Sequence, residues 1–210
     1  MGEVEKWIAL TYVPNLGPRR IASVFRELGS IDSFFSDNPA VLSSVLNLRT
    51  DIISSMLRAV DLRRGIAEAE TCRRRGIGIV CPQSSDYPRL LLECHDPPPV
   101  LYYLGEMPRQ DLLAVVGSRK ATRYGRSVTA GLIPALCQAG FGIASGLAIG
   151  IDACAHRACL EDGGYTLAIL GNGVDLFYPY ENHQLQKDIL AKGGCLISEF
   201  PPGTKPRPNH

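Results

Sequence analysis

The spacing of apolar residues divides the chain into two parts with different expected structures. In residues 1–75, apolar side chains recur at helical spacing, and Asp or Thr stands near several of the expected helix starts. The helices predicted in this part cover residues 4–12, 19–28, 32–35, 39–46 and 50–75. We therefore expect a small helical domain over residues 1–75.

From residue 76 onward, short apolar runs alternate with helix-like segments. The predicted strands cover residues 77–81, 100–104, 112–116, 141–144, 166–170 and 195–198. The predicted helices lie near residues 124–139, 151–161 and 183–192. Because the strands are short and uniformly apolar, we expect an α/β domain over residues 76–210 with a mostly parallel sheet that is covered on both faces.

Glycine-rich turns follow three of the predicted strands. They contain glycines at positions 117, 146, 171 and 173. In a parallel sheet such turns lie at the carboxyl edge of the strands, where open α/β sheets bind ligands. The sequence therefore predicts a ligand site at this edge.

The first of these turns is strongly cationic. Residues 112–151 contain no Asp or Glu, yet four cations fall within eight of these positions: Arg119, Lys120, Arg123 and Arg126. The preceding strand ends in Gly117 and Ser118. Backbone N–H groups of a turn, a helix N-terminus and guanidinium groups would meet here, which favours a phosphate site. The alternative is a solvated basic turn, in which Lys120, Arg123 and Arg126 form a solvent-facing helix edge.

The other two turns carry weaker signals. Ser145 and Gly146 lead into Asp152 and His156, which are four residues apart and would share a helix face. This pair lacks a third metal ligand and a nucleophile, so we expect a structural cap. Asn172 lies in the third turn, and the aromatic residues within 177–180 would either stack on bases or pack the loop onto the sheet.

Composition limits the classes of function. The formal net charge is +1, from 22 Lys and Arg against 21 Asp and Glu, so nucleic-acid binding would need a local patch. The seven cysteines form no CxxC pair, which excludes the common metal motifs. Neither a dinucleotide fingerprint nor a Walker A motif is present, and we expect no cofactor, no metal, no catalytic residue and no enzyme. Without a signal peptide or a long apolar run, we expect a cytoplasmic chain with no membrane segment.

Four motifs, in this order and spacing, closely resemble the DNA-processing protein A family (DprA, also called Smf): VVGSR, SGLAIGIDACAH, GNGVDLFYPYEN and SEFPPGTKP. The segment DYPRLL…DPPPVLYYLG is similar to the approach to that family's Rossmann-like domain. The PNLGPRR turn resembles the sterile-alpha-motif or helix-hairpin-helix-like module that many members carry. The resemblance spans almost the whole chain.

The resemblance implies a non-enzymatic protein of natural transformation (competence) and DNA recombination. Such proteins bind and protect incoming single-stranded DNA, load the recombinase RecA onto it, and form homodimers through the Rossmann-like domain. By position, the implied DNA pocket includes Gly117, Ser118 and Arg119, with Ser145, Gly146 and the loop near Asn172 as further candidates. Together with Lys120 and Arg123 of the cationic turn, these are the predicted DNA-binding residues.

Three features of this chain depart from the family pattern. Tyr180 and Ile149 stand where relatives often have basic residues. The family also continues into an FPxRNR segment that adds basic pocket residues and dimer surface. This chain ends at His210, before that segment, so we expect its Rossmann-like domain to be incomplete at the C-terminus.

Two other classes of function remain as alternatives. One is a nucleotide- or phosphoribosyl-processing enzyme of the lysine-decarboxylase-like Rossmann group, which also uses glycine-rich turns at the sheet edge. That class needs a Glu-rich signature beside the phosphate turn, and the acid-free stretch 112–151 argues against it. The other is a helical scaffold with a vestigial Rossmann-like part.

Overall fold

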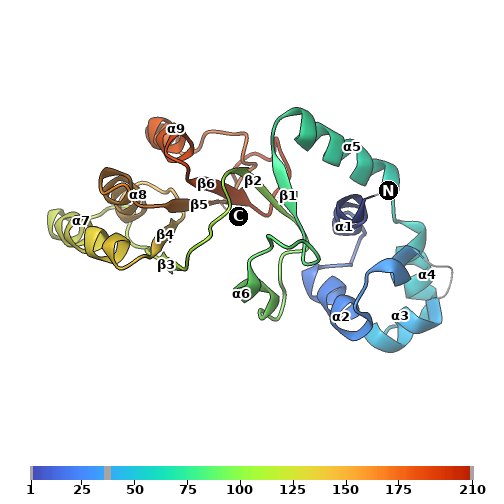
Figure 1. Cartoon of the computed structure of the whole chain (residues 1–210). Coiled ribbons are helices and arrows are strands. Elements are labelled where there is room, and N and C mark those ends of the chain that lie inside the picture. Colours follow the sequence, from blue (N-terminus) through green and yellow to red (C-terminus); the bar gives the residue numbers. More distant parts are fainter. Residues whose placement is uncertain (1, 36–38, 209–210) are drawn as a thin grey trace. The chain divides into compact units, whose positions relative to one another are not determined.

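The structure, a computed structural model, describes residues 2–35 and 39–208 (Figure 1). The chain divides into two compact units, Met1–Leu101 and Tyr102–His210. The sequence placed a domain boundary after residue 75. That boundary stays a prediction.

The first unit is mainly helical, as the apolar spacing predicted. Its helices are α1 (Glu3–Thr11), α2 (Pro18–Leu28), the 3-10 helix η1 (Asp32–Phe35), α3 (Pro39–Leu46), α4 (Thr50–Arg58), α5 (Leu62–Arg74) and the short α6 (Arg89–Leu92). The single helix predicted over residues 50–75 is wrong, because the chain breaks between α4 and α5. Asp61 begins α5 by accepting hydrogen bonds from the N–H groups of Arg63 and Arg64. Asp61 therefore begins a second helix within the range predicted for one.

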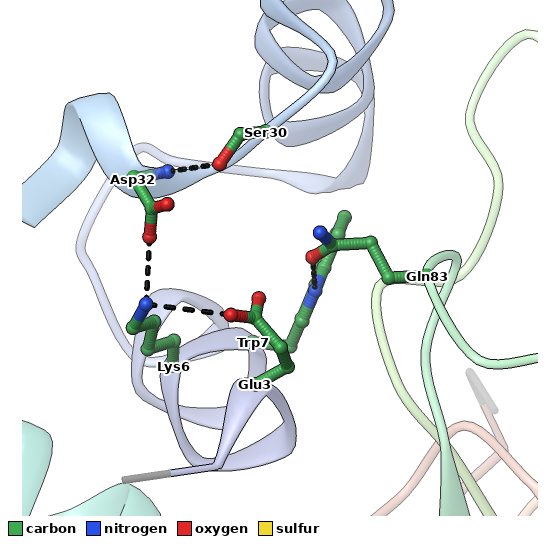
Figure 2. A network of polar contacts seen from close by, with 6 residues as sticks. All are labelled: Glu3, Lys6, Trp7, Ser30, Asp32 and Gln83. Atoms are coloured by element: carbon green, nitrogen blue, oxygen red, sulfur yellow. Dashed lines mark hydrogen bonds and ion pairs between the residues drawn. The ribbon is translucent and has the colours of Figure 1, made fainter.

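The polar contacts of the first unit hold its segments to α1 (Figure 2). Trp7 is fully buried, packs edge-to-face on Phe25 with ring centroids 5.3 Å apart, and donates its Nε1–H to Gln83 Oε1 at 2.7 Å. Gln83 follows the short strand β1 (Gly78–Val80). Lys6 binds Asp32 at 2.7 Å, and this contact lowers the pKa of the Asp32 carboxyl. The segment after β1 therefore packs with the helices of this unit.

The second unit contains a mostly parallel sheet, which confirms the predicted α/β class. Its strands are β2 (Leu101–Gly105), β3 (Leu112–Ala114), β4 (Gly142–Ser145), β5 (Thr166–Leu170) and β6 (Cys195–Ser198). They lie in the order β2-β6-β5-β4-β3. Strands β3 to β6 are parallel, and β2 runs antiparallel to β6. The carboxyl ends of β3, β4 and β5 therefore lie side by side at one edge.

Three helices connect the parallel strands: α7 (Arg123–Gln138), α8 (Ile151–Glu161) and α9 (His183–Ala191). Helix α8 packs against both α7 and α9, and also against β4 and β5. The core beneath these helices contains Ile133 of α7, Ile143 of β4 and Cys159 of α8. No helix among the described residues is long and apolar enough to cross a membrane.

The strands β4 and β6 are buried on both faces, as their apolar runs predicted, although the described helices of this unit lie on one face only. Successive parallel strands are direct neighbours in the sheet, so each right-handed crossover places its helix on the same side. Ile143 faces those helices, whereas Ile169 alternates to the opposite face and is 52% exposed. Apolar strands indicated burial, but they did not show which faces the helices of this chain would cover.

Candidate nucleic-acid interface

The turn between β3 and α7 is held by its own polar groups. Ser118 Oγ accepts the Lys120 N–H at 3.1 Å, and Thr122 Oγ1 accepts the Gly125 N–H at 3.0 Å, which caps α7. The Ser118 carbonyl oxygen accepts the Ile151 N–H at 3.2 Å and so ties the turn to the start of α8. The main chain of the turn is therefore fixed before any ligand binds.

Glycines allow this close approach between the turn and α8. A Cβ added to Gly117 would lie 2.8 Å from the Ile151 side chain. Gly150 adopts a φ of 99°, and a Cβ there would collide with the Ser118 carbonyl oxygen. Both positions therefore require glycine, and the packing places Arg119 at the surface beside the start of α8.

The cations of the turn lie at the surface of the protein. Arg119, Lys120, Arg123 and Arg126 are all exposed. Within the described residues, no carboxylate forms an ion pair with any of them. Four uncompensated positive charges on one short surface segment attract an external anion, whereas the chain as a whole is close to neutral.

The junction between β4 and α8 has a different chemistry. Asp152 is buried, and its Oδ2 accepts the N–H groups of Gly146 at 3.2 Å and Ala148 at 3.4 Å. This agrees with the predicted structural role of Asp152. Ser145 is also buried, and its hydroxyl donates to the Val115 carbonyl oxygen at 2.6 Å. The polar groups of this junction therefore have partners inside the protein.

His156 is a structural residue of α8. It is fully buried, and its Nδ1 lies 2.7 Å from Thr166 Oγ1, whose hydroxyl donates to the Ile143 carbonyl oxygen. Burial lowers the pKa of His156 to about 4, so the ring is neutral near pH 7. Among the described residues, no group of three or more His, Cys, Asp or Glu could hold a metal ion.

The loop after β5 is shaped by Asn172. This residue is buried, and its Nδ2 donates to the carbonyl oxygens of Gly173 at 2.9 Å and Leu176 at 3.2 Å. Further along the loop, Phe177 and Tyr180 are 50% and 82% exposed, and both rings contact the His183 ring. These two rings lie at the surface rather than in the core.

The structure brings some predicted site residues together and separates others. Gly117, Ser118, Arg119, Lys120 and Arg123 form one continuous exposed segment. Ser145 contacts the end of β3 from below that segment, Gly146 is exposed at the next strand end, and Asn172 follows β5 one strand further along the edge. Their assignment as DNA contacts stays a prediction. The side chains of Ser145 and Asn172 form hydrogen bonds inside the protein, so they shape this edge of the sheet.

One arginine near this edge was missed by the sequence reasoning. Arg157 of α8 lines a cavity of about 440 Å³ that Arg119 and Arg126 also line. It lies outside the acid-free stretch that marked the cationic turn. No motif of the cationic turn marks it in the sequence.

The chain is similar in sequence to a known protein family. A sequence model of the family described as DNA recombination-mediator protein A matches residues 78–210. The protein Smf from Synechocystis is 35% identical over 206 residues, which cover 95% of this chain and 52% of that protein. The DNA processing protein DprA from Bacillus subtilis is 39% identical over 141 residues, or 66% of this chain and 47% of that protein. The chain thus spans about half the length of these relatives.

Two solved structures are similar. The X-ray structure of DNA processing protein A from Streptococcus pneumoniae matches with a TM-score of 0.81 and 27% identity, over 100% of this chain and 71% of that one. DNA processing protein A from Helicobacter pylori, solved for its single-stranded DNA binding mode, matches with a TM-score of 0.53 and 26% identity, over 63% and 60% of the two chains. The family match covers more than half of this chain, and the resemblance noted in its motifs is confirmed: the chain belongs to the DNA recombination-mediator protein A family.

Proposed function

We propose that this chain binds single-stranded DNA through the cationic turn, which we define as residues 117–126. The observation that carries the proposal is the set of four exposed cations without carboxylate partners among the described residues. Arginine and lysine side chains at a fixed turn neutralise backbone phosphates. The Helicobacter pylori relative, which binds single-stranded DNA, supports the choice of ligand.

The surroundings of the turn favour single strands over duplex. The exposed Phe177 and Tyr180 rings follow β5 at the same edge of the sheet, and every unstacked base presents a face to such rings. Bases in a duplex remain stacked on one another and offer no such face. Because arginine and main-chain groups at a turn contact phosphate rather than base edges, we expect little sequence preference.

The wider role that the family resemblance implies is part of the same proposal. The protein acts in natural transformation, where it protects incoming single strands and loads RecA onto them. It works as a homodimer in the cytoplasm and carries out no catalysis of its own. The neutral, buried His156 and the internally bonded Asp152 support the last point, because neither is available to a substrate.

A titration with three ligands tests the proposal. Fluorescently labelled oligo(dT), a duplex of the same length and labelled ATP are added separately to the whole chain, and anisotropy is followed. We expect binding of oligo(dT), weaker binding of the duplex and no binding or hydrolysis of ATP. Tight ATP binding without oligo(dT) binding would instead support the nucleotide-processing alternative.

A further inference from the structure

Two cysteines of neighbouring helices bring their sulfur atoms into contact. Cys137 stands next to the last residue of α7, and Cys159 lies two residues before the end of α8. These two helices pack against each other (Figure 1). The Cys137 thiol donates to Cys159 Sγ at 3.6 Å, although the two residues are 22 positions apart in sequence. Because α7 and α8 end shortly before the amino ends of β4 and β5, this contact lies at the amino edge of the sheet.

The surrounding packing keeps the two sulfurs together. Cys159 is fully buried, and its thiol donates to the Tyr165 carbonyl oxygen at 3.2 Å. A Cβ added to Gly164 would lie 2.6 Å from Cys137 Sγ and 2.9 Å from Cys159 Sγ, so the turn before β5 has no room for a side chain beside the sulfurs. A disulfide bond is about 2.05 Å long, so each sulfur needs to move by less than about 1 Å to form one.

The two thiols differ in access and in acidity. Cys137 is partly exposed, whereas Cys159 is buried. Burial, reinforced by the neighbouring Cys137 thiol, raises the pKa of Cys159 to about 12. Cys159 therefore stays a neutral thiol inside the protein. Cys137 is the member of the pair that a small oxidant in solution reaches first.

We propose that Cys137 and Cys159 form a disulfide when hydrogen peroxide oxidises the protein, and that this bond joins α7 to α8. The Cys137 sulfur attacks one peroxide oxygen, the O–O bond breaks, and Cys137 sulfenic acid and one water form. The Cys159 sulfur then attacks the Cys137 sulfur. The S–S bond forms, the S–O bond breaks, and the leaving hydroxide takes the Cys159 thiol proton as a second water. Two thiols are thus oxidised, and one hydrogen peroxide is reduced to two waters.

The expected consequence is a more stable second unit. The bond closes a loop of 22 positions and so restricts the unfolded chain more than the folded one. It lies at the amino edge of the sheet, whereas the cationic turn follows the carboxyl end of β3. The crosslink therefore protects the fold during oxidation, and it does not depend on the DNA site.

Peptide mapping of the oxidised chain tests the proposal. The whole native chain is treated with a small excess of hydrogen peroxide, free thiols are blocked with iodoacetamide, and the chain is digested with trypsin without reduction. Cleavage after Arg126, Arg157 and Lys187 leaves Cys137 in peptide 127–157 and Cys159 in peptide 158–187. Thiols held in contact react at a high effective concentration, so this linked pair should exceed any other cysteine pair about tenfold. Treatment with dithiothreitol should separate the two peptides.

A matched pair of variants assigns the bond. Peptide 127–157 also contains Cys154, which is partly exposed like Cys137. Cys154→Ser should keep the linked peptides, and its Tm should rise on oxidation by about 5 °C, as in the unaltered chain. Cys137→Ser should give no linked peptides and no rise in Tm. Each oxidised variant is compared with its own reduced form, so any loss of stability from the substitution itself cancels.

The outcomes decide the proposal. Linked peptides from the native chain that dithiothreitol separates and that Cys137→Ser lacks support it. It is overturned if Cys137 is only blocked or oxidised to the sulfinic acid, or if the link forms only in urea, where all seven cysteines can meet. A link that survives in Cys137→Ser would belong to Cys154 and would also overturn it. A link that leaves the Tm unchanged would overturn the protective role.

Discussion

The two neighbouring strand–helix junctions at the edge of the sheet differ in charge: one contains a buried carboxylate, and the other carries exposed cations. At the junction of β4 and α8, Asp152 is buried and accepts N–H groups of the loop before its own helix. At the junction of β3 and α7, no acidic residue stands nearby in sequence, and the four cations are exposed. Both junctions have the same topology, yet one contains its own carboxylate and the other carries exposed cations without one.

The difference shows how one architecture separates stability from binding. The Asp152 carboxylate holds the loop between β4 and α8 through two hydrogen bonds. Gly117 and Ser118 pack against the start of α8 beside this loop. The adjacent turn packs on this junction, and its cations stay exposed. Changes at the α8 junction should therefore alter the free energy of unfolding, and changes at the cationic turn should alter DNA affinity.

The largest expected effect concerns His156, beneath the α8 junction. Its pKa of about 4 in the folded chain lies below the ordinary 6.5 of the unfolded chain, so the unfolded state binds more protons between these pH values. Stability is therefore lost as the pH falls through this window, by about 3 kcal/mol at pH 4 at 1.36 kcal/mol per pKa unit.

Urea unfolding from pH 7 to pH 4 measures this loss. His156→Asn is the matched variant, because its amide can donate to Thr166 and does not titrate. The variant should show a flatter decline in the free energy of unfolding than the unaltered chain. Parallel profiles would show that His156 is not the group that carries the acid sensitivity.

The next effect concerns Asp152. Asp152→Ala removes the acceptor of two N–H groups at a buried site and should lower the free energy of unfolding by about 2 kcal/mol. Asp162→Ala, at the exposed C-terminal end of the same helix, should cost less than about 0.5 kcal/mol. If both variants lost the same free energy of unfolding in urea, the hydrogen bonds of Asp152 would contribute no special stability to the β4–α8 junction.

Arg119→Ala should act on binding alone. We expect oligo(dT) affinity to fall about tenfold, or about 1.4 kcal/mol, with the free energy of unfolding unchanged within about 0.5 kcal/mol. Arg126→Ala should weaken binding less, because Arg126 lies in α7 beyond its first residues, whereas Arg119 lies in the turn itself. Equal losses in anisotropy titrations would indicate a diffuse basic surface without a defined turn site.

The local sequence predicted the helices and strands well where tertiary contacts did not override the local preference. The strands at 166–170 and 195–198 and the helix at 151–161 have the predicted bounds, because uniform apolar runs bounded by glycine leave few other choices. The break at Asp61 was missed because apolar spacing continued through it. That the helices of the second unit lie on one face of the sheet was not predictable, because apolar strands do not show which sides the crossover helices cover.

The site was predictable only where its residues are adjacent in sequence. Gly117, Ser118 and Arg119 stand together after one strand, so their motif was visible. Arg157 enters the cavity only because α8 packs beside the turn, a tertiary contact that leaves almost no trace in the sequence. Ser145 and Asn172 were singled out by position, and their buried hydrogen bonds became visible only in the fold.

The salt dependence of oligo(dT) binding tests the central claim most directly. With ~0.7 counterions released per phosphate on single strands, two to four contacts give a log–log slope of roughly −1.4 to −2.8. Arg119→Ala should make this slope shallower by about 0.7, while Arg109→Glu, at an exposed position before the amino end of β3, should leave it unchanged. An Arg119→Ala slope equal to that of the unaltered chain, or tighter binding of duplex than of oligo(dT), would show that the cationic turn is not the DNA site.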